Sequence, residues 1–200
     1  MLKLLSRAFY SRSPEIVARA LLGKLLIRDL HGERLTGHIT EVEAYLGLTD
    51  PASHAYRGLT PNNAPLFGPP GHTHVYFIYG MYYCLNVASH IPGEAGGVLI
   101  RALYPIDGIE TMAHLRGLPG TSNPKLLTGG PGRICQALAI TRKADNDTDV
   151  TSRSSTIQIA DDGTHPREIQ ATPRIGISKA KDEPLRFLWT NPALRKTPHA

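Results

Sequence analysis

Residues 75–89, VYFIYGMYYCLNVAS, decide the fold prediction. Two runs rich in aromatic and β-branched residues flank Gly80, which predicts a β-hairpin with Gly80 at or next to its tip. The hairpin lies within residues 58–93, which contain no Asp, Glu, Lys or Arg. A charge-free segment of this kind predicts a buried, central hairpin. The residues that we expect in its buried part are Tyr83, Leu85 and Val87.

The tip of this hairpin has a different character. A hairpin tip projects into solvent, so Tyr79 and Met81 expose apolar surface there unless a partner receives them. A stack of nucleic-acid bases is one such partner, because apolar side chains inserted between base steps unstack a duplex. The net charge of +5 and the sequence pI of about 9.3 favour a polyanionic partner without requiring one. Much of the basic surplus lies in residues 1–30, where a solvated basic face and a phosphate-binding face are both open readings.

A predicted strand, residues 35–45, contains two carboxylates. Its period of two places Glu41, Glu43 and Tyr45 on one face. The pair would simply be solvated if that face were the outer side of an edge strand. Arg101 lies in the otherwise apolar run 98–103, so its guanidinium is expected inside the protein or in a cleft wall. A buried guanidinium requires a carboxylate, and either glutamate can supply it; such a pair beside an aromatic ring can hold a water molecule.

The remaining pattern predicts an α+β fold in a single compact domain, residues 1–200 with a core at about 13–190. We expect a mixed or antiparallel curved sheet, surrounding helices and a protruding β-hairpin. Residues 50–67 read as short helical turns and loop, and residues 141–149 as a polar loop. Further strands are predicted at 24–30 and 98–104 and around Ile157, Ile175 and Phe187, and helices at 13–22, 107–116 and 131–140.

The cysteines and histidines argue against a cofactor or a metal. Cys84 and Cys135 are far apart and form no CxxC motif, which fits a reducing cytoplasm. His72 and His74, with Cys84 and His90 nearby, lack the spacing of four zinc ligands, so no metal is expected. Residues 129–133 (GGPGR) could cradle a phosphate but read better as a turn. No secretory or membrane-spanning segment is visible.

Several blocks of the sequence resemble the alkyladenine (3-methyladenine) DNA glycosylases. They stand in family order and cover most of the chain from about residue 15 to residue 190. The blocks are RALLGK (19–24), TEVEAYLG (40–47), DPASHAYRG (50–58), VYFIYGMYYCLN (75–86), LIRAL (99–103), GPGRICQAL (130–138) and PRIG (173–176).

The resemblance implies a role for each matching position. Glu43 matches the carboxylate that activates water, Arg101 an arginine that holds the water, and Ile175 a backbone carbonyl that contacts it. Asn86 matches the residue that discriminates against the amino group of normal guanine. The positions that match the walls of the base pocket are Tyr45, His54 and Tyr76. The positions that match the DNA-intercalating tip are Tyr79, with Met81 and Tyr82 beside it.

The implied activity is the release of alkylated purines from duplex DNA by a monofunctional glycosylase. The expected lesions are 3-methyladenine and 7-methylguanine, with hypoxanthine and ethenoadenine as further candidates, and the product is an abasic site. The enzyme is expected to act as a monomer in a bacterial-type cytoplasm, at the nucleoid when bound to DNA. A non-catalytic nucleic-acid-binding module and a nucleoside hydrolase remain alternatives. The chain departs from the family pattern at Asn62, where an arginine is usual, at His74, where an aromatic is expected, and at Gly129, where asparagine is usual.

Overall fold

β3, Glu33–Tyr45, is the strand around which the sheet is arranged. In this computed structural model, which describes residues 2–190, β3 pairs with β6 along one edge and with β2 and then β9 along the other. Every pairing between these strands is antiparallel. The order of the strands across the sheet is β1-β7-β2-β3-β6-β5-β4, and β8 pairs with β9. The other strands are β1 Lys3–Leu4, β2 Leu25–Leu30, β4 Thr73–Ile78, β5 Tyr82–Ala88, β6 Gly97–Asp107, β7 Ile157–Asp161, β8 Ile169–Thr172 and β9 Arg186–Trp189.

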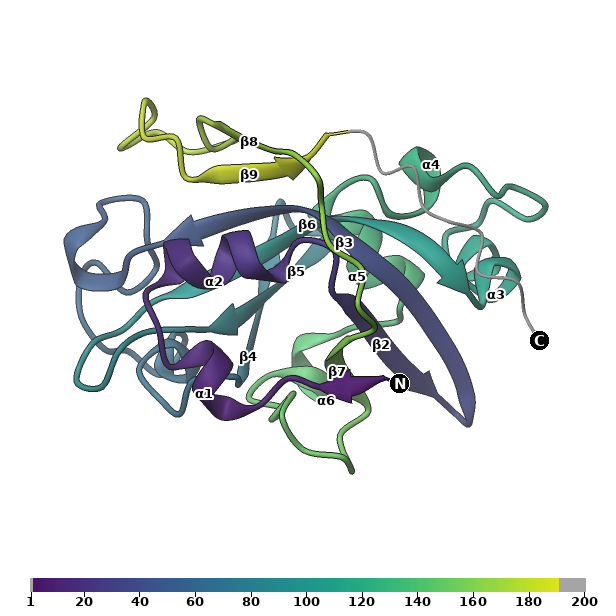
Figure 1. Ribbon diagram of the computed structural model, residues 1–200, viewed down its shortest axis with the longest axis horizontal. Coiled ribbons are helices and arrows are strands. Elements are labelled where there is room, and N and C mark those ends of the chain that lie inside the picture. Colours follow the sequence, from purple (N-terminus) through teal and green to yellow (C-terminus); the bar gives the residue numbers. More distant parts are fainter. Residues whose placement is uncertain (1, 191–200) are drawn as a thin grey trace.

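The helices are short and lie around this curled sheet (Figure 1). α2 packs on β3 and β6, and α5 packs on β5 and β6. No helix within residues 2–190 is long and apolar enough to span a membrane. The predicted α+β fold in a single compact domain is confirmed. The helices are α1 Arg7–Tyr10, α2 Pro14–Leu21, α3 Ile109–Leu115, α4 Pro124–Thr128, α5 Pro131–Ala137 and α6 Arg142–Asp145, with 3-10 turns η1 Gly47–Thr49 and η2 Ala64–Leu66.

The predicted hairpin is formed by β4 and β5, but it is not central, because β4 is the last strand in the order of the sheet. Leu85 and Val87 are buried as predicted, whereas Tyr83 is only half-buried. Ile78 faces Tyr82 across the turn, and the Met81 N–H donates to the Ile78 carbonyl at 3.2 Å. Two successive residues at the tip have positive φ, +51° at Tyr79 and +68° at Gly80. Gly80 accepts this geometry freely, whereas a left-handed tyrosine costs roughly 1–2 kcal/mol. The strained Tyr79 is also 80% exposed, so neither backbone preference nor burial explains a tyrosine at this position.

An irregular step in the β3–β6 pairing determines where Arg101 lies. Glu41 pairs with Ala102 and Val42 pairs with Ile100, so Arg101 is the extra residue of a β-bulge. Bulges re-aim side chains, and here the side chain of Arg101 reaches the face of β3 that carries the two glutamates. The core on the other face of β3 includes Val42, which is fully buried.

Four further sequence predictions need correction. No strand forms at Ile175, because β8 ends at Thr172 and the following loop bends at Gly176, which has φ +76°. The predicted helix 107–116 begins only at Ile109, because Asp107 still pairs with Thr36 in the sheet.

The nearly continuous apolar character of residues 98–104 predicts a strand buried on both sides. The strand forms, but β5 covers only its first part and Tyr104 is 36% exposed. Residues 141–149 are not only loop: Thr141 caps the short helix α6 by accepting a hydrogen bond from the Ala144 N–H at 3.2 Å. The short elements β1, α1 and α4 are not among the predicted elements. Of these, α4 does carry a start signal, because Asn123 precedes Pro124 and its side chain accepts the Lys125 N–H at 3.0 Å.

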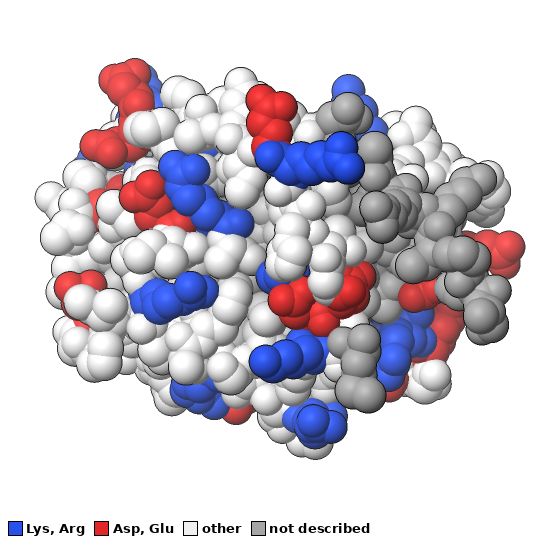
Figure 2. Space-filling view, in the orientation of Figure 1, with Lys and Arg blue, Asp and Glu red and all other residues white. Residues whose placement is uncertain are grey.

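Half of the basic residues in the N-terminal segment have structural partners far along the chain. These partners are acidic residues, and the most completely buried pair is that of Arg28, whose partner is also buried. Figure 2 shows positive and negative side chains interspersed on this face of the molecule. The pairs are Arg7 with Asp149, Lys24 with Asp161 and Arg28 with Asp145.

Candidate active site

A cavity of about 300 Å³ lies between the β4–β5 hairpin, β6 and the loops that follow β3 and β8. It brings together most of the predicted site residues from five separate parts of the sequence. The predicted residues that line it are Tyr45, His54, Tyr76, Tyr79, Asn86, Arg101 and Ile175. Met81 is 63% exposed at the hairpin tip, and Tyr82 is half-buried against Gly132 of α5; neither lines the cavity.

Glu43 does not line the cavity itself but lies directly behind its wall. The side chain is fully buried on β3, between β6 and β9. Its Oε1 accepts the Ile175 N–H at 2.8 Å, and its Oε2 accepts the Tyr45 hydroxyl at 2.9 Å and lies 3.2 Å from Arg101 Nη1. All three donors belong to residues that line the cavity. The carboxylate is therefore held in one orientation by the wall that faces a bound molecule.

Glu41 holds the guanidinium from the other side. Arg101 Nε donates to Glu41 Oε1 at 2.9 Å, and Arg186 Nη1 on β9 donates to the same oxygen at 2.9 Å. Burial alone would lower the pKa of Arg101, but Glu43 and Glu41 outweigh it and raise that pKa. Burial, with Glu43 as a second cause, holds the pKa of Tyr45 well above its usual value. Arg101 thus stays charged, and Tyr45 stays a proton-bearing donor.

Aromatic rings form the opposite wall. The ring of Tyr76 lies 4.4 Å from that of His54, nearly perpendicular to it, and 5.3 Å from that of His74, nearly parallel to it. Asn86 faces His74 across the hairpin, and its Oδ1 is buried without a hydrogen-bond partner among residues 2–190. This amide oxygen is available to an N–H group of a molecule in the cavity.

The two histidines make stability depend on pH. Burial, together with nearby His54 and Arg142, lowers the pKa of His74 from 6.5 to about 3, and burial lowers the pKa of His54. Below pH 6.5 the unfolded chain therefore binds protons that the folded protein does not, so the free energy of unfolding falls as the pH falls, by up to about 1.4 kcal/mol per pH unit for the buried His74. His54 is exposed to solvent, so its contribution is smaller. Urea unfolding at pH 7.5 and pH 5.5 should show this loss, and His74→Phe should reduce it.

His72→Gln is the matched control, because His72 lies on the same segment but pairs with Asp147 outside the cavity. An equal pH-dependent loss in the His74→Phe variant and the parent would contradict the assignment of the effect to His74.

An ion pair that the sequence did not reveal anchors two loops of the site. Arg174 and Asp50 are both buried, and Arg174 Nη2 donates to Asp50 Oδ1 at 2.9 Å. Arg174 also donates to the Ala44 carbonyl at 3.0 Å and lies over the ring of Tyr45 at 4.8 Å. Burial would raise the pKa of Asp50, but hydrogen bonds from Arg174 and two backbone amides outweigh it and lower that pKa. The pair Asp50-Pro51 resembles a helix start, and the Asp50 carboxylate accepts the Ala52 N–H at 3.0 Å, but no helix follows.

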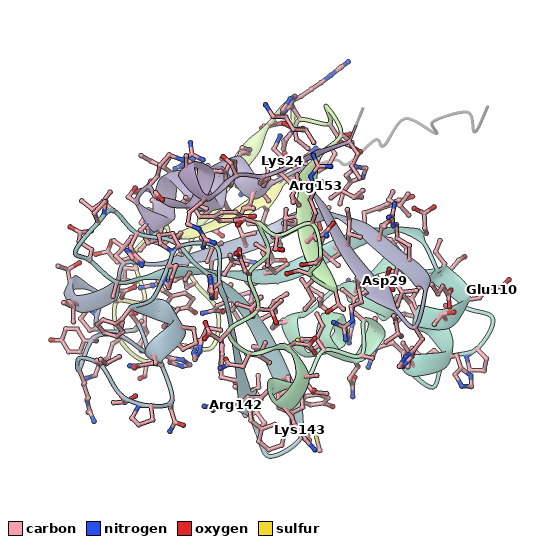
Figure 3. The ribbon with its side chains drawn as sticks, turned by 90° about the horizontal axis from the view of Figure 1, so that it is seen from below. Lys24, Asp29, Glu110, Arg142, Lys143 and Arg153 are labelled. Atoms are coloured by element: carbon pink, nitrogen blue, oxygen red, sulfur yellow. The ribbon has the colours of Figure 1, made fainter. Side chains whose placement is uncertain are left out.

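The other motifs have structural roles. Within residues 2–190, no group of three or more His, Cys, Asp and Glu side chains is arranged to hold a metal ion. His90 contacts backbone carbonyls, unlike a metal ligand. At position 129, a Cβ would lie 2.6 Å from the Lys125 carbonyl, which explains glycine in place of asparagine. Asn62 accepts a hydrogen bond from Arg142 at 3.0 Å, so an arginine lies next to this position. Arg142 belongs to α6 and is labelled in Figure 3.

Comparisons with known proteins identify the family. The model of the methylpurine-DNA glycosylase (MPG) family matches residues 8–193. A protein of Koribacter versatilis is 52% identical over 184 residues, covering 92% of this chain and 88% of its own. One of Carboxydothermus hydrogenoformans is 46% identical, with 94% and 96% covered, and one of Clostridium botulinum is 42% identical, with 92% and 93% covered. Each bears the name "Putative 3-methyladenine DNA glycosylase". With a family match over most of its length and relatives this similar, the chain belongs to the methylpurine-DNA glycosylase family.

Proposed function

We propose that this protein removes alkylated purines from duplex DNA by hydrolysing the N-glycosidic bond and leaves an abasic site. The proposed substrates are 3-methyladenine and 7-methylguanine. The main support is the placement of Glu43, a fully buried carboxylate held by three donors that line an aromatic-walled cavity. The names of the relatives support DNA that contains 3-methyladenine as the substrate.

The chemistry follows from the charge of the lesion. A purine alkylated at N3 or N7 is cationic, so it leaves as a neutral base when the electron pair of its bond to C1′ passes to the ring. Positive charge develops on the sugar, and a nearby carboxylate stabilises it. Water then forms the new bond to C1′ and gives its proton to Glu43. Arg101, which contacts Glu43, and the backbone carbonyl of Ile175 are proposed to hold that water. Tyr76 and the neutral His54 line the cavity, so they contact a cationic base without repelling it.

A groove beside the cavity supports DNA as the substrate. This groove, of about 410 Å³, shares Ala52, His54 and Ile177 with the cavity. Its lining also includes the cations Arg57 and Lys179. When a nucleotide occupies the cavity, the phosphates of its strand would pass these two side chains.

The hairpin tip is proposed to fill the space that the extruded nucleotide leaves. Tyr79 is strained and 80% exposed, as expected for a side chain kept for a partner. Tyr79→Ser should lower excision from duplex DNA by roughly tenfold to a hundredfold, because aromatic stacking on bases is worth about 1–3 kcal/mol. Excision from single-stranded DNA should fall much less, since no duplex has to be opened there.

Tyr104→Ser is the control for this variant, because Tyr104 is also exposed but lies on β6 away from the cavity. Equal losses on duplex and single-stranded substrates would argue against the proposed role of Tyr79.

The function is tested by incubating the protein with methylated duplex DNA and identifying any base that is released. Release of 3-methyladenine and 7-methylguanine, with the strand intact, is the expected result. Salt-sensitive DNA binding without release would indicate a binding module. Release from free nucleosides, but not from DNA, would indicate a nucleoside hydrolase.

A further inference from the structure

Two histidines of the site are hydrogen-bonded to each other. His54 Nδ1 and His74 Nε2 are 3.2 Å apart, and the rings meet nearly at right angles. His54 lines the cavity, while His74 lies behind it on β4 with 1% of its surface exposed. His74 is held in place by its near-parallel stack on Tyr76. The pair therefore links a cavity residue to a fixed group in the sheet.

This bond needs one proton between two nitrogens, and two arrangements supply it. If His54 donates, His74 must carry its own proton on Nδ1. That atom is buried and has no partner among residues 2–190, so an N–H group there would be a buried donor without an acceptor. If His74 donates from Nε2, its Nδ1 is only a bare lone pair. Buried donors without partners are rarer and costlier than buried acceptors without partners, so the second arrangement is favoured.

The consequence appears on the other side of His54. When its Nδ1 accepts from His74, the proton of the neutral ring sits on Nε2. Within residues 2–190, Nε2 makes no hydrogen bond to the protein, and His54 is an exposed residue that lines the cavity, so Nε2 is open to a molecule there.

We propose that His74 is a positioning residue that fixes His54 with its proton on Nε2, so that the cavity offers an N–H donor to a hydrogen-bond acceptor of the extruded nucleotide. The identity of the nucleotide rests on the proposed function, whereas the state of His54 does not. Two acceptors of a nucleotide have this chemistry: a ring nitrogen or carbonyl oxygen on the edge of the base, and an oxygen of its phosphate.

The first experiment needs no substrate. Nitrogen-15 NMR of the histidines in the full-length, ligand-free protein should show His54 with a protonated Nε2 and a bare Nδ1. His74→Phe should give a mixture of tautomers at His54, whereas His74→Gln, which keeps a donor near the position of Nε2, should preserve most of the parent signal. A proton on Nδ1 of His54 in the parent protein would overturn the proposal, even if the protein proves to be a glycosylase.

The second experiment measures excision by the same variants. His74→Phe should raise KM roughly threefold to tenfold, the loss of about one neutral hydrogen bond, with kcat changed much less. His74→Gln should recover most of this loss, and His72→Gln should behave as the parent. Unchanged KM in His74→Phe, or no recovery in His74→Gln although both variants remain folded, would overturn the proposal.

The acceptor is identified by changing it. A methylphosphonate at the lesion removes the anionic phosphate oxygen, and comparison of hypoxanthine with unsubstituted purine removes the carbonyl oxygen of the base. The substitution that weakens binding to the parent but not to His74→Phe marks the acceptor. If neither substitution shows this difference, the donor role is wrong.

Discussion

Glu43→Gln is expected to lower base excision by about a thousandfold or more, because the amide neither takes the proton of the attacking water nor offers a full negative charge to the sugar. Affinity for lesion-containing DNA should change little, since Glu43 does not line the cavity. Single-turnover release of 3-methyladenine and 7-methylguanine, with DNA binding measured separately, checks both statements. Release at the parent rate would show that Glu43 is not the base.

The variant must also be shown to fold. Both carboxylate oxygens of Glu43 accept hydrogen bonds, from Ile175 on one side and from Tyr45 on the other. A glutamine turns one of these acceptors into an NH₂ group that faces a donor, which should cost about 1–3 kcal/mol of stability. Thermal unfolding should show a single, lowered transition. Excision by a folded variant then reports on chemistry.

Glu41→Gln is the matched control. It makes the same change two residues earlier on the same face of β3, where Glu41 touches Arg101 and Arg186 but not Glu43. We expect it to lower excision by about tenfold or less, because a hydrogen bond that orients Arg101 is weakened while the buried carboxylate remains. Equal losses in the two variants would indicate that the effect comes from the ion-pair network and not from Glu43.

The local parts of this architecture were predictable from the sequence because short-range rules determine them. Alternation and one glycine are enough for the β4–β5 hairpin, and the period of two is enough to place Glu41, Glu43 and Tyr45 on one face. The interior position of Arg101 followed from the cost of a guanidinium in an apolar strand. For His54 and Asn86, only the resemblance to a family suggested a site, and their functional roles stay predictions.

The other features depend on contacts between distant residues. Asp50 and Arg174 are 124 positions apart, so no local pattern shows that they pair. The basic residues near the N-terminus could not be recognised as structural, because acidic partners such as Asp145 and Asp161 come from the other end of the chain. The bulge at Arg101 likewise depends on how two strands match, which neither strand shows alone.

Asp50→Ala is expected to destabilise the fold by about 3–5 kcal/mol, because it leaves the Arg174 guanidinium buried without its carboxylate. The side chain of Arg174 is fully buried and 4% of that of Asp50 is exposed, so water cannot replace the lost partner without opening the loops. This loss is a large part of the about 5–15 kcal/mol that holds a typical domain together. Urea unfolding of the parent and the variant at pH 7.5 measures it.

Glu15→Ala provides the comparison, since Glu15 also pairs with an arginine, Arg19, but both side chains are about half exposed, at 47% and 45%. Its removal should cost less than about 1 kcal/mol. The double variant Asp50→Leu with Arg174→Leu should be more stable than Asp50→Ala, because it leaves no unpaired charge in the interior. The double variant should still excise damaged bases poorly. Arg174 donates to the Ala44 carbonyl and directly precedes Ile175, whose N–H donates to Glu43, so its loss should disturb the position of Glu43. If Asp50→Ala cost no more than Glu15→Ala, this ion pair would not be what holds the two loops against β3.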